Sequence, residues 1–81
     1  MKIYIHVTHD QMYQLLEKKN FDKYCESPYQ VRMVFAKNVF SYFEVYDWLT
    51  NYVYETCTSV ESMNKFFEEA VNGERPARTN E

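Results

Sequence analysis

Two histidines and two cysteines are the residues of this chain that could hold a metal. His6 and His9 have the spacing of a ligand pair, and Cys25 or Cys57 could complete the set. A zinc site needs three or four ligands that converge on one point. We expect His6 on the outer face of a strand and His9 at the start of a helix, so convergence is not required by the fold. The sequence therefore predicts no metal site and no cofactor.

Nucleophilic or acid–base catalysis finds equally little support in the residue pattern. A reactive cysteine needs an electropositive setting, and Lys23 is the only cation near Cys25. Cys57 falls among apolar residues and is typical of a core thiol. Carboxylate pairs such as Glu68 and Glu69 fall on predicted solvent faces, where no burial shifts their pKa. The single glycine of the chain excludes a glycine-rich phosphate loop. We predict that the protein is not an enzyme.

Aromatic residues are the most informative feature of the chain, which has eight Tyr, six Phe and one Trp. Aromatic side chains bury roughly 150–250 Å² each and dominate interfaces as well as cores. A single small domain has difficulty hiding many of them on one element. Seven of these fifteen residues fall in one short stretch: Phe40, Tyr42, Phe43, Tyr46, Trp48, Tyr52 and Tyr54. The stretch predicts a surface that binds another protein.

The first half of the chain gives clear signals for a strand, a helix and a second strand. Strict alternation of apolar and polar residues over Lys2–Val7 predicts a half-buried strand. Thr8 and Gln11 have the spacing of a capping box, which predicts a helix that ends near Asn20. Val31–Ala36 is rich in β-branched and aromatic residues and predicts a second strand.

The segment from Val39 to Tyr54 gives two conflicting signals. Its β-branched and aromatic residues favour a strand, which would form a hairpin across Lys37 and Asn38. Its polar residues, however, recur at steps of three and four, as a helix requires. We give the period greater weight and predict a helix over Tyr42–Cys57. Its solvent-facing stripe would consist of Glu44, Asp47, Asn51 and Glu55.

These elements predict an α+β fold with the order β-α-β-α-α, in which a two-stranded sheet packs against three helices. Thr58 and Glu61 mark the start of the last helix, and Asn72-Gly73 marks its end. We expect a single domain over residues 1–73 and a disordered tail over 74–81. A two-stranded sheet is marginal by itself. We therefore expect a homodimer in which a second copy completes the sheet.

The leading functional hypothesis is a small non-enzymatic module that inhibits or redirects another protein by steric binding through the aromatic helix. The low glycine content and frequent Lys, Asn, Tyr and Phe are typical of an AT-rich genome. This usage suggests a bacteriophage or another mobile element, with a host or defence protein as the target. The predicted partner-binding residues are Trp48, Tyr52, Tyr54, Phe43, Glu44, Asp47 and Glu55.

The alternative hypothesis is a small RNA- or DNA-binding regulator. It rests on a basic cluster near the end of the first predicted helix and on the second strand. The formal net charge of −3 weakens it, since binding to phosphates depends on positive charge. The residues of the cluster are Lys18, Lys19, Lys23, Arg32 and Lys37.

The sequence also predicts a cytoplasmic protein. Its first residues read as a strand, whereas a signal peptide has a charged segment followed by a long apolar run. No apolar stretch approaches the roughly 20 residues that span a membrane. Two cysteines with no signal peptide favour free thiols in a reducing compartment.

Overall fold

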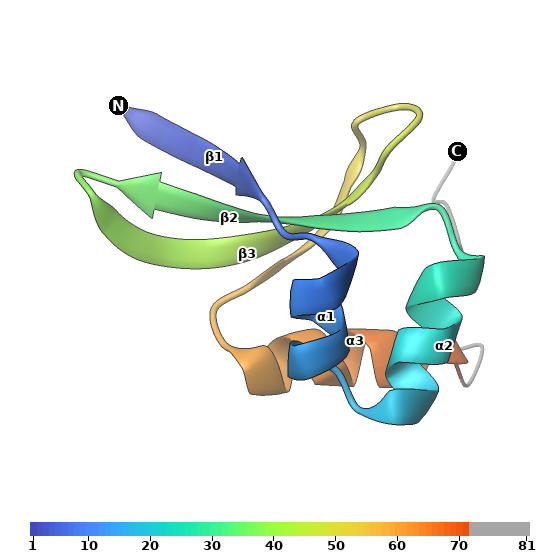
Figure 1. The fold of residues 1–81 in the computed structure, drawn as a ribbon. Coiled ribbons are helices and arrows are strands. Elements are labelled where there is room, and N and C mark those ends of the chain that lie inside the picture. The colour runs from blue at the N-terminus through green and yellow to red at the C-terminus, as the bar shows by residue number, and fades with distance from the viewer. Residues whose placement is uncertain (72–81) are drawn as a thin grey trace.

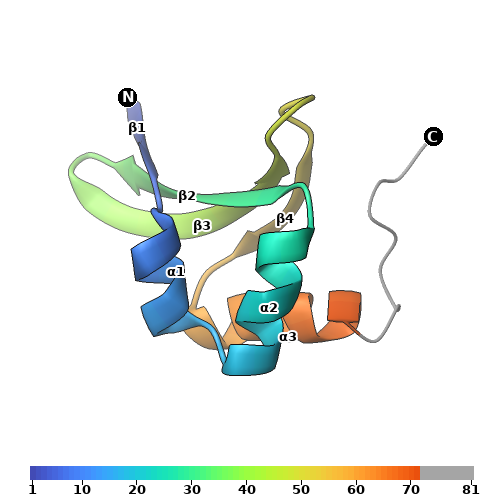
Figure 2. The same ribbon diagram turned by 45° about the vertical axis from the view of Figure 1, so that its right-hand side comes forward.

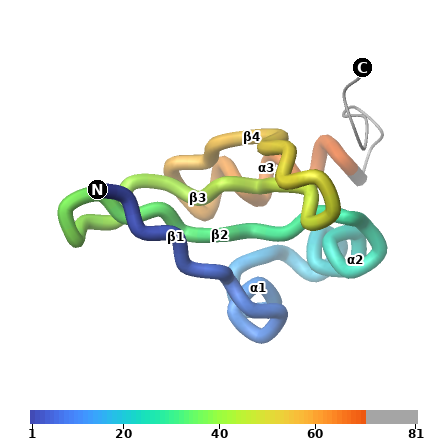
Figure 3. The backbone as a smooth tube through the Cα atoms, turned by 90° about the horizontal axis from the view of Figure 1, so that it is seen from above, coloured from blue at the N-terminus to red at the C-terminus, as the bar shows by residue number. Residues whose placement is uncertain are grey.

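A computed structural model describes residues 1–71 of the chain. They form a four-stranded antiparallel sheet with the order β1-β2-β3-β4, and three helices cover one face of it while the other face stays open (Figures 1 and 2). Figure 3 shows the strands side by side in this order. The strands are β1 (Lys2–His6), β2 (Tyr29–Ala36), β3 (Val39–Asp47) and β4 (Val53–Cys57), and the helices are α1 (His9–Leu15), α2 (Lys18–Glu26) and α3 (Val60–Val71).

The predicted two-stranded sheet and the predicted helix over Tyr42–Cys57 are both wrong. The aromatic segment forms β3 and β4, and β3 makes a hairpin with β2. Lys37 and Asn38 have φ angles of 54° and 66°, the left-handed values that a two-residue hairpin turn of type I′ requires. The strand propensity of the segment prevails because each strand places apolar side chains against the helices.

The N-terminal elements confirm a strand at the predicted place and the capping box, but all five residues of β1 are exposed, so the predicted half-buried strand is wrong in its burial. Thr8 and Gln11 cap α1 reciprocally, as their spacing indicates. The helix predicted to run to Asn20 is interrupted, however, since Leu16 has extended backbone angles. The Asn64 side chain explains the break: its amide donates to the Leu15 carbonyl at 3.0 Å and accepts from the Glu17 N–H at 2.9 Å. A side chain of α3 thus replaces the helical hydrogen bonds between α1 and α2.

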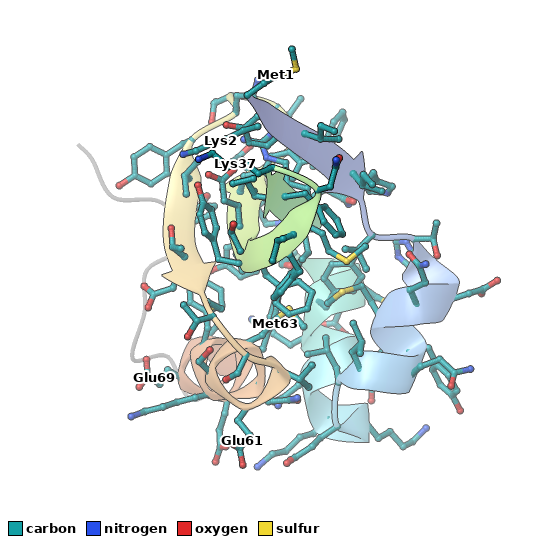
Figure 4. The ribbon with its side chains drawn as sticks, turned by 90° about the vertical axis from the view of Figure 1, so that its left-hand side faces the viewer. Met1, Lys2, Lys37, Glu61, Met63 and Glu69 are labelled. Carbon is teal, nitrogen blue, oxygen red and sulfur yellow. The ribbon has the colours of Figure 1, made fainter. Side chains whose placement is uncertain are left out.

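The last helix is confirmed over Val60–Val71 and its predicted end at Asn72-Gly73 lies outside the described residues, but its predicted cap is wrong. The side chain of Ser59 accepts the N–H of Ser62 at 3.1 Å, and Thr58 and Glu61 form no such pair among the hydrogen bonds found. Met63 points from α3 towards the sheet, whereas Glu61 points away from it (Figure 4). The helix therefore buries one face against the strands.

The core lies between the three helices and the covered face of the sheet. Its largest fully buried side chains come from α1, α2 and α3 and meet valines of the strands. Aromatic rings in it pack edge to face, for example Tyr24 on Phe67 at 5.7 Å. The core consists of Val7, Met12, Leu16, Tyr24, Tyr29, Val31, Phe43, Val45, Cys57, Met63, Phe66, Phe67 and Ala70.

The predicted domain limit at residue 73 and the predicted tail over 74–81 lie outside the residues that the structure describes. None of the helices within residues 1–71 is long and apolar enough to cross a membrane.

Candidate protein-binding site: the β3–β4 turn

The connection between β3 and β4 displays apolar side chains that the core does not use. Trp48, Leu49 and Tyr52 are 59%, 67% and 44% exposed. Figures 1 and 2 show this connection projecting from the sheet at the end of β3, on the side away from the helices. We call residues 47–52 the anchor turn.

The carboxylate of Asp47 holds the anchor turn together from inside the protein. Asp47 is fully buried. Its Oδ1 accepts the N–H groups of Leu49 and Thr50 at 2.9 and 3.2 Å, and its Oδ2 accepts the hydroxyl of Tyr54 at 2.9 Å. Hydrogen bonds to a charged acceptor are among the stronger ones in proteins. Oδ1 of this buried acid therefore holds the turn, while Oδ2 connects it to β4.

Backbone hydrogen bonds close the turn at its base. The N–H of Asp47 donates to the Tyr52 carbonyl, and the N–H of Asn51 donates to the Asp47 carbonyl, each at 2.7 Å. Asn51 has a φ of 65°, a left-handed value that asparagine accepts more readily than most residues. Trp48 donates its N–H to the Pro28 carbonyl at 3.2 Å, which ties the turn to the start of β2.

The arrangement is suited to binding a protein surface. Trp and Tyr are enriched among the residues that dominate binding energies. A turn that is already held in one conformation loses little entropy when it binds. The anchor turn therefore combines exposed anchors with a backbone fixed by buried hydrogen bonds.

The other residues predicted to bind a partner are buried or half-buried in the fold. Phe43 is in the core with 7% of its surface exposed. Tyr54 is half-buried and packs edge to face on Tyr29 at 4.9 Å. Glu55 is half-buried in β4. The predicted solvent stripe is wrong at Asp47, which is buried, because its side chain lies on the covered face of β3 opposite Tyr29.

Glu44 lies on the open face of the sheet and pairs with Arg32. Its Oε1 accepts the Arg32 Nε–H at 2.8 Å, and the side chains of Arg32 and Glu44 are 22% and 13% exposed. The guanidinium also lies 4.2 Å from the ring centroid of Tyr46 and 5.2 Å from that of Tyr4. These are distances at which a cation attracts an aromatic ring. Arg32 therefore bridges three strands on the open face.

The basic cluster predicted for nucleic-acid binding is divided between distant parts of the fold. Lys18, Lys19 and Lys23 are on α2, beneath the sheet, and Lys19 forms an ion pair with Glu68 at 3.6 Å. Arg32 is on the opposite, open face, and Lys37 is in the β2–β3 turn. The fold does not bring the five cations to one surface.

The histidines and cysteines are also spread over the fold. His6 is exposed on β1, while the His9 ring lies 5.1 Å from the ring of Tyr24. Cys25 is exposed, Cys57 is buried, and both are free thiols. Within residues 1–71, no three His, Cys, Asp or Glu side chains come together as a metal site would require.

Sequence reasoning missed Leu49, which is the most exposed apolar residue of the anchor turn. It also missed the role of Asp47. A usable signal was present: aspartate commonly opens a turn by accepting the backbone N–H groups two and three residues later. Asn51 adds a residue that tolerates left-handed angles.

No protein-family model, curated protein or solved structure matches the chain.

Proposed function

We propose that this protein is a non-enzymatic binding module whose anchor turn inserts Trp48 and Leu49 into a pocket of a partner protein. The observation that carries the proposal is the buried Asp47 carboxylate, which binds two N–H groups of an exposed apolar turn with one oxygen and anchors the turn to Tyr54 of β4 with the other. Adjacent exposed apolar side chains are a common mark of a protein-interaction site. The action of the module would be steric, by occupying the pocket.

Tyr52 supports the anchors from the side. Its ring lies 5.2 Å from that of Tyr54 in an edge-to-face arrangement, and Tyr54 in turn donates its hydroxyl to Asp47. The exposed ring is thus connected through one neighbour to the buried acid. Trp48 therefore keeps its predicted role as an anchor, while Tyr52 and Tyr54 are supporting residues and Phe43 belongs to the core. A host or defence protein stays the predicted class of target.

Affinity capture tests the proposal when it compares matched baits. The baits are the wild-type protein, Trp48→Ala with Leu49→Ala, and Tyr13→Ala. Tyr13 is a suitable control because it is an aromatic residue on α1 with a similar exposed fraction of 63%. Each capture from host lysate is done with and without nuclease.

We expect a protein that wild type and Tyr13→Ala retain, that the double variant loses, and that nuclease does not release. Retention of every captured protein by the double variant would contradict the proposal. Release by nuclease would instead favour a nucleic-acid partner, whose binding should weaken steeply with salt.

A further inference from the structure

The first strand of the sheet has a neighbour on one side only. Within residues 1–71, β1 pairs with β2 and forms one edge of the sheet. Figure 3 shows β1 on the outside of the strand layer, across β2 and β3 from β4. An uncovered edge strand presents a row of N–H and C=O groups that can pair with another strand.

The direction of these backbone groups follows from one hydrogen bond. The N–H of Val7 donates to the carbonyl of Val31 on β2 at 2.9 Å. Because the direction alternates along an antiparallel strand, Ile3 and Ile5 also point their backbone groups towards β2. The backbone N–H and C=O groups of the alternate residues therefore point outward, away from β2. These residues are Lys2, Tyr4 and His6.

The usual protections of an edge strand are missing from β1. Its register with β2 continues without a bulge up to His6, and it contains no proline. Its one lysine does not guard the edge, since Lys2 Nζ donates to the Tyr42 hydroxyl at 3.1 Å and lies 5.6 Å from that ring. Figure 4 shows Lys2 at the end of the sheet near Lys37 of the β2–β3 turn. Tyr4 leans inward as well, over Arg32.

Two isoleucines of β1 stay exposed on the face that the helices cover elsewhere. Ile3 and Ile5 are opposite Phe35 and Met33 of β2, on the side of the core, yet they are 44% and 45% exposed. An open groove of about 300 Å³ lies further along this face, with Val7, Leu15 and Met33 in its lining, and Met33 is opposite Ile5. The edge strand thus offers apolar side chains together with its backbone groups.

We infer that β1 pairs with β1 of a second copy, antiparallel about a two-fold axis at Tyr4, to form a continuous eight-stranded sheet. The strand is its own complement in this register: Tyr4 meets Tyr4, and Ile3 meets Ile5 of the second copy. All four isoleucines would then share one face. The outward N–H and C=O groups of Lys2, Tyr4 and His6 would bond across the axis.

This symmetry is the reason to name a second copy as the occupant rather than another peptide. Isologous two-fold contacts are the commonest interfaces between identical chains. The dimer would also carry two anchor turns, so a partner with two sites would bind with increased avidity.

Three variants of β1 test the inference, and sedimentation equilibrium measures the oligomeric state of each. Tyr4→Pro removes an N–H that faces outward, which an edge strand tolerates. Tyr4→Ala is the matched control, since it removes the same side chain and keeps the N–H. Ile5→Lys is a second variant that leaves the backbone intact and places like charges near each other in the dimer. Thermal unfolding shows that each variant folds.

We expect wild type and Tyr4→Ala to dimerise. In Tyr4→Pro the dissociation constant should rise about 30-fold, as the loss of two backbone hydrogen bonds implies, and Ile5→Lys should weaken the dimer as well. A wild-type protein that stays monomeric at the highest attainable concentration would overturn the inference. So would a dimer that Tyr4→Pro and Ile5→Lys leave unchanged.

Discussion

The phenol of Tyr54 donates its proton to the buried carboxylate of Asp47 at 2.9 Å, and this bond joins β4 to the anchor turn. The other oxygen of the same carboxylate accepts two N–H groups of the turn. The strand and the turn are therefore coupled through a single acid. Substitutions of Asp47 should therefore increase the mobility of the exposed anchor residues, although those residues themselves are unchanged.

Asp47→Ala should lower the free energy of unfolding by about 2 to 4 kcal/mol, because three hydrogen bonds to a charged acceptor are lost. Asp47→Asn keeps an acceptor for the turn and should cost less. Urea unfolding gives both values, and NMR relaxation of residues 48–52 reports the mobility of the turn. A turn as ordered in Asp47→Ala as in wild type would contradict the role of the acid.

Replacing Arg32 should show a strong preference for the guanidinium over an ammonium. Lysine keeps the charge but loses both the Nε–H donated to Glu44 and the planar guanidinium that lies near the rings of Tyr4 and Tyr46. A double-mutant cycle of Arg32→Ala and Glu44→Ala should give a coupling of about 1 to 2 kcal/mol. Denaturant unfolding measures it, and a coupling near zero would mean that the pair acts as an ordinary exposed ion pair.

Asn64 should be the most sensitive polar residue of α3. Its side chain bonds to the Leu15 carbonyl and the Glu17 N–H, and also accepts the amide of the fully buried Asn20. Asn64→Ala leaves these groups without their partner and should cost about 2 to 4 kcal/mol. Thermal unfolding measures the loss. Ser62→Ala on the same helix is a useful comparison, since it removes only a contact at the helix start.

Tyr24 should make the protein sensitive to alkaline pH. Burial raises the pKa of its phenol to about 12, with smaller contributions from Cys25 and Tyr46. Its hydroxyl finds no hydrogen-bond partner within the described part of the chain. In the unfolded chain the phenol ionises near its ordinary value of about 10, so the unfolded state loses the proton first. The free energy of unfolding should therefore fall as pH rises from about 10 to 12, by roughly 2 kcal/mol.

Tyr24→Phe isolates this effect. The variant lacks both the ionisable group and the unpaired hydroxyl, so it should be more stable than wild type by about 1 to 2 kcal/mol at neutral pH. The difference between the two proteins should widen above pH 10. Chemical unfolding at several pH values measures it. A difference that is constant with pH would show that the phenol does not titrate in this way.

The parts of the fold that could be predicted from the sequence are those set by local chemistry. Alternation identified β1, and the Thr8–Gln11 pair identified the start of α1. The break at Leu16 could not be found in this way, because it depends on Asn64, which is distant in the chain. Long-range hydrogen bonds of this kind leave no local pattern.

The error over the aromatic segment has a specific cause. Glu44, Asp47 and Asn51 are spaced like the polar face of a helix, yet each is polar for a different reason. Glu44 pairs with Arg32 on the open face, Asp47 accepts hydrogen bonds inside the turn, and Asn51 adopts a left-handed angle. Their spacing is therefore accidental. The strand propensity of their neighbours and the two-residue Lys37-Asn38 turn were the better signals.

The candidate site could be predicted only in part, because composition identifies the stretch of chain but not the face that each residue takes. The aromatic excess pointed to the correct stretch of chain, and Trp48 and Tyr52 are exposed there. Phe43 was assigned to the surface because a helix would place it on a flank, whereas in β3 it lies opposite Met33 on the covered face of the sheet. Exposure depends on which face each residue takes, and that follows from the register of the sheet.

The central claim is that Trp48 is the main anchor for a partner protein, and the dissociation constant of the captured partner tests it most directly. Titration calorimetry with wild type, Trp48→Ala and Tyr13→Ala gives the three values. We predict that Trp48→Ala weakens binding by at least about 30-fold, which corresponds to about 2 kcal/mol, while Tyr13→Ala binds as wild type does. Equal dissociation constants for wild type and Trp48→Ala, with the fold intact, would contradict the claim.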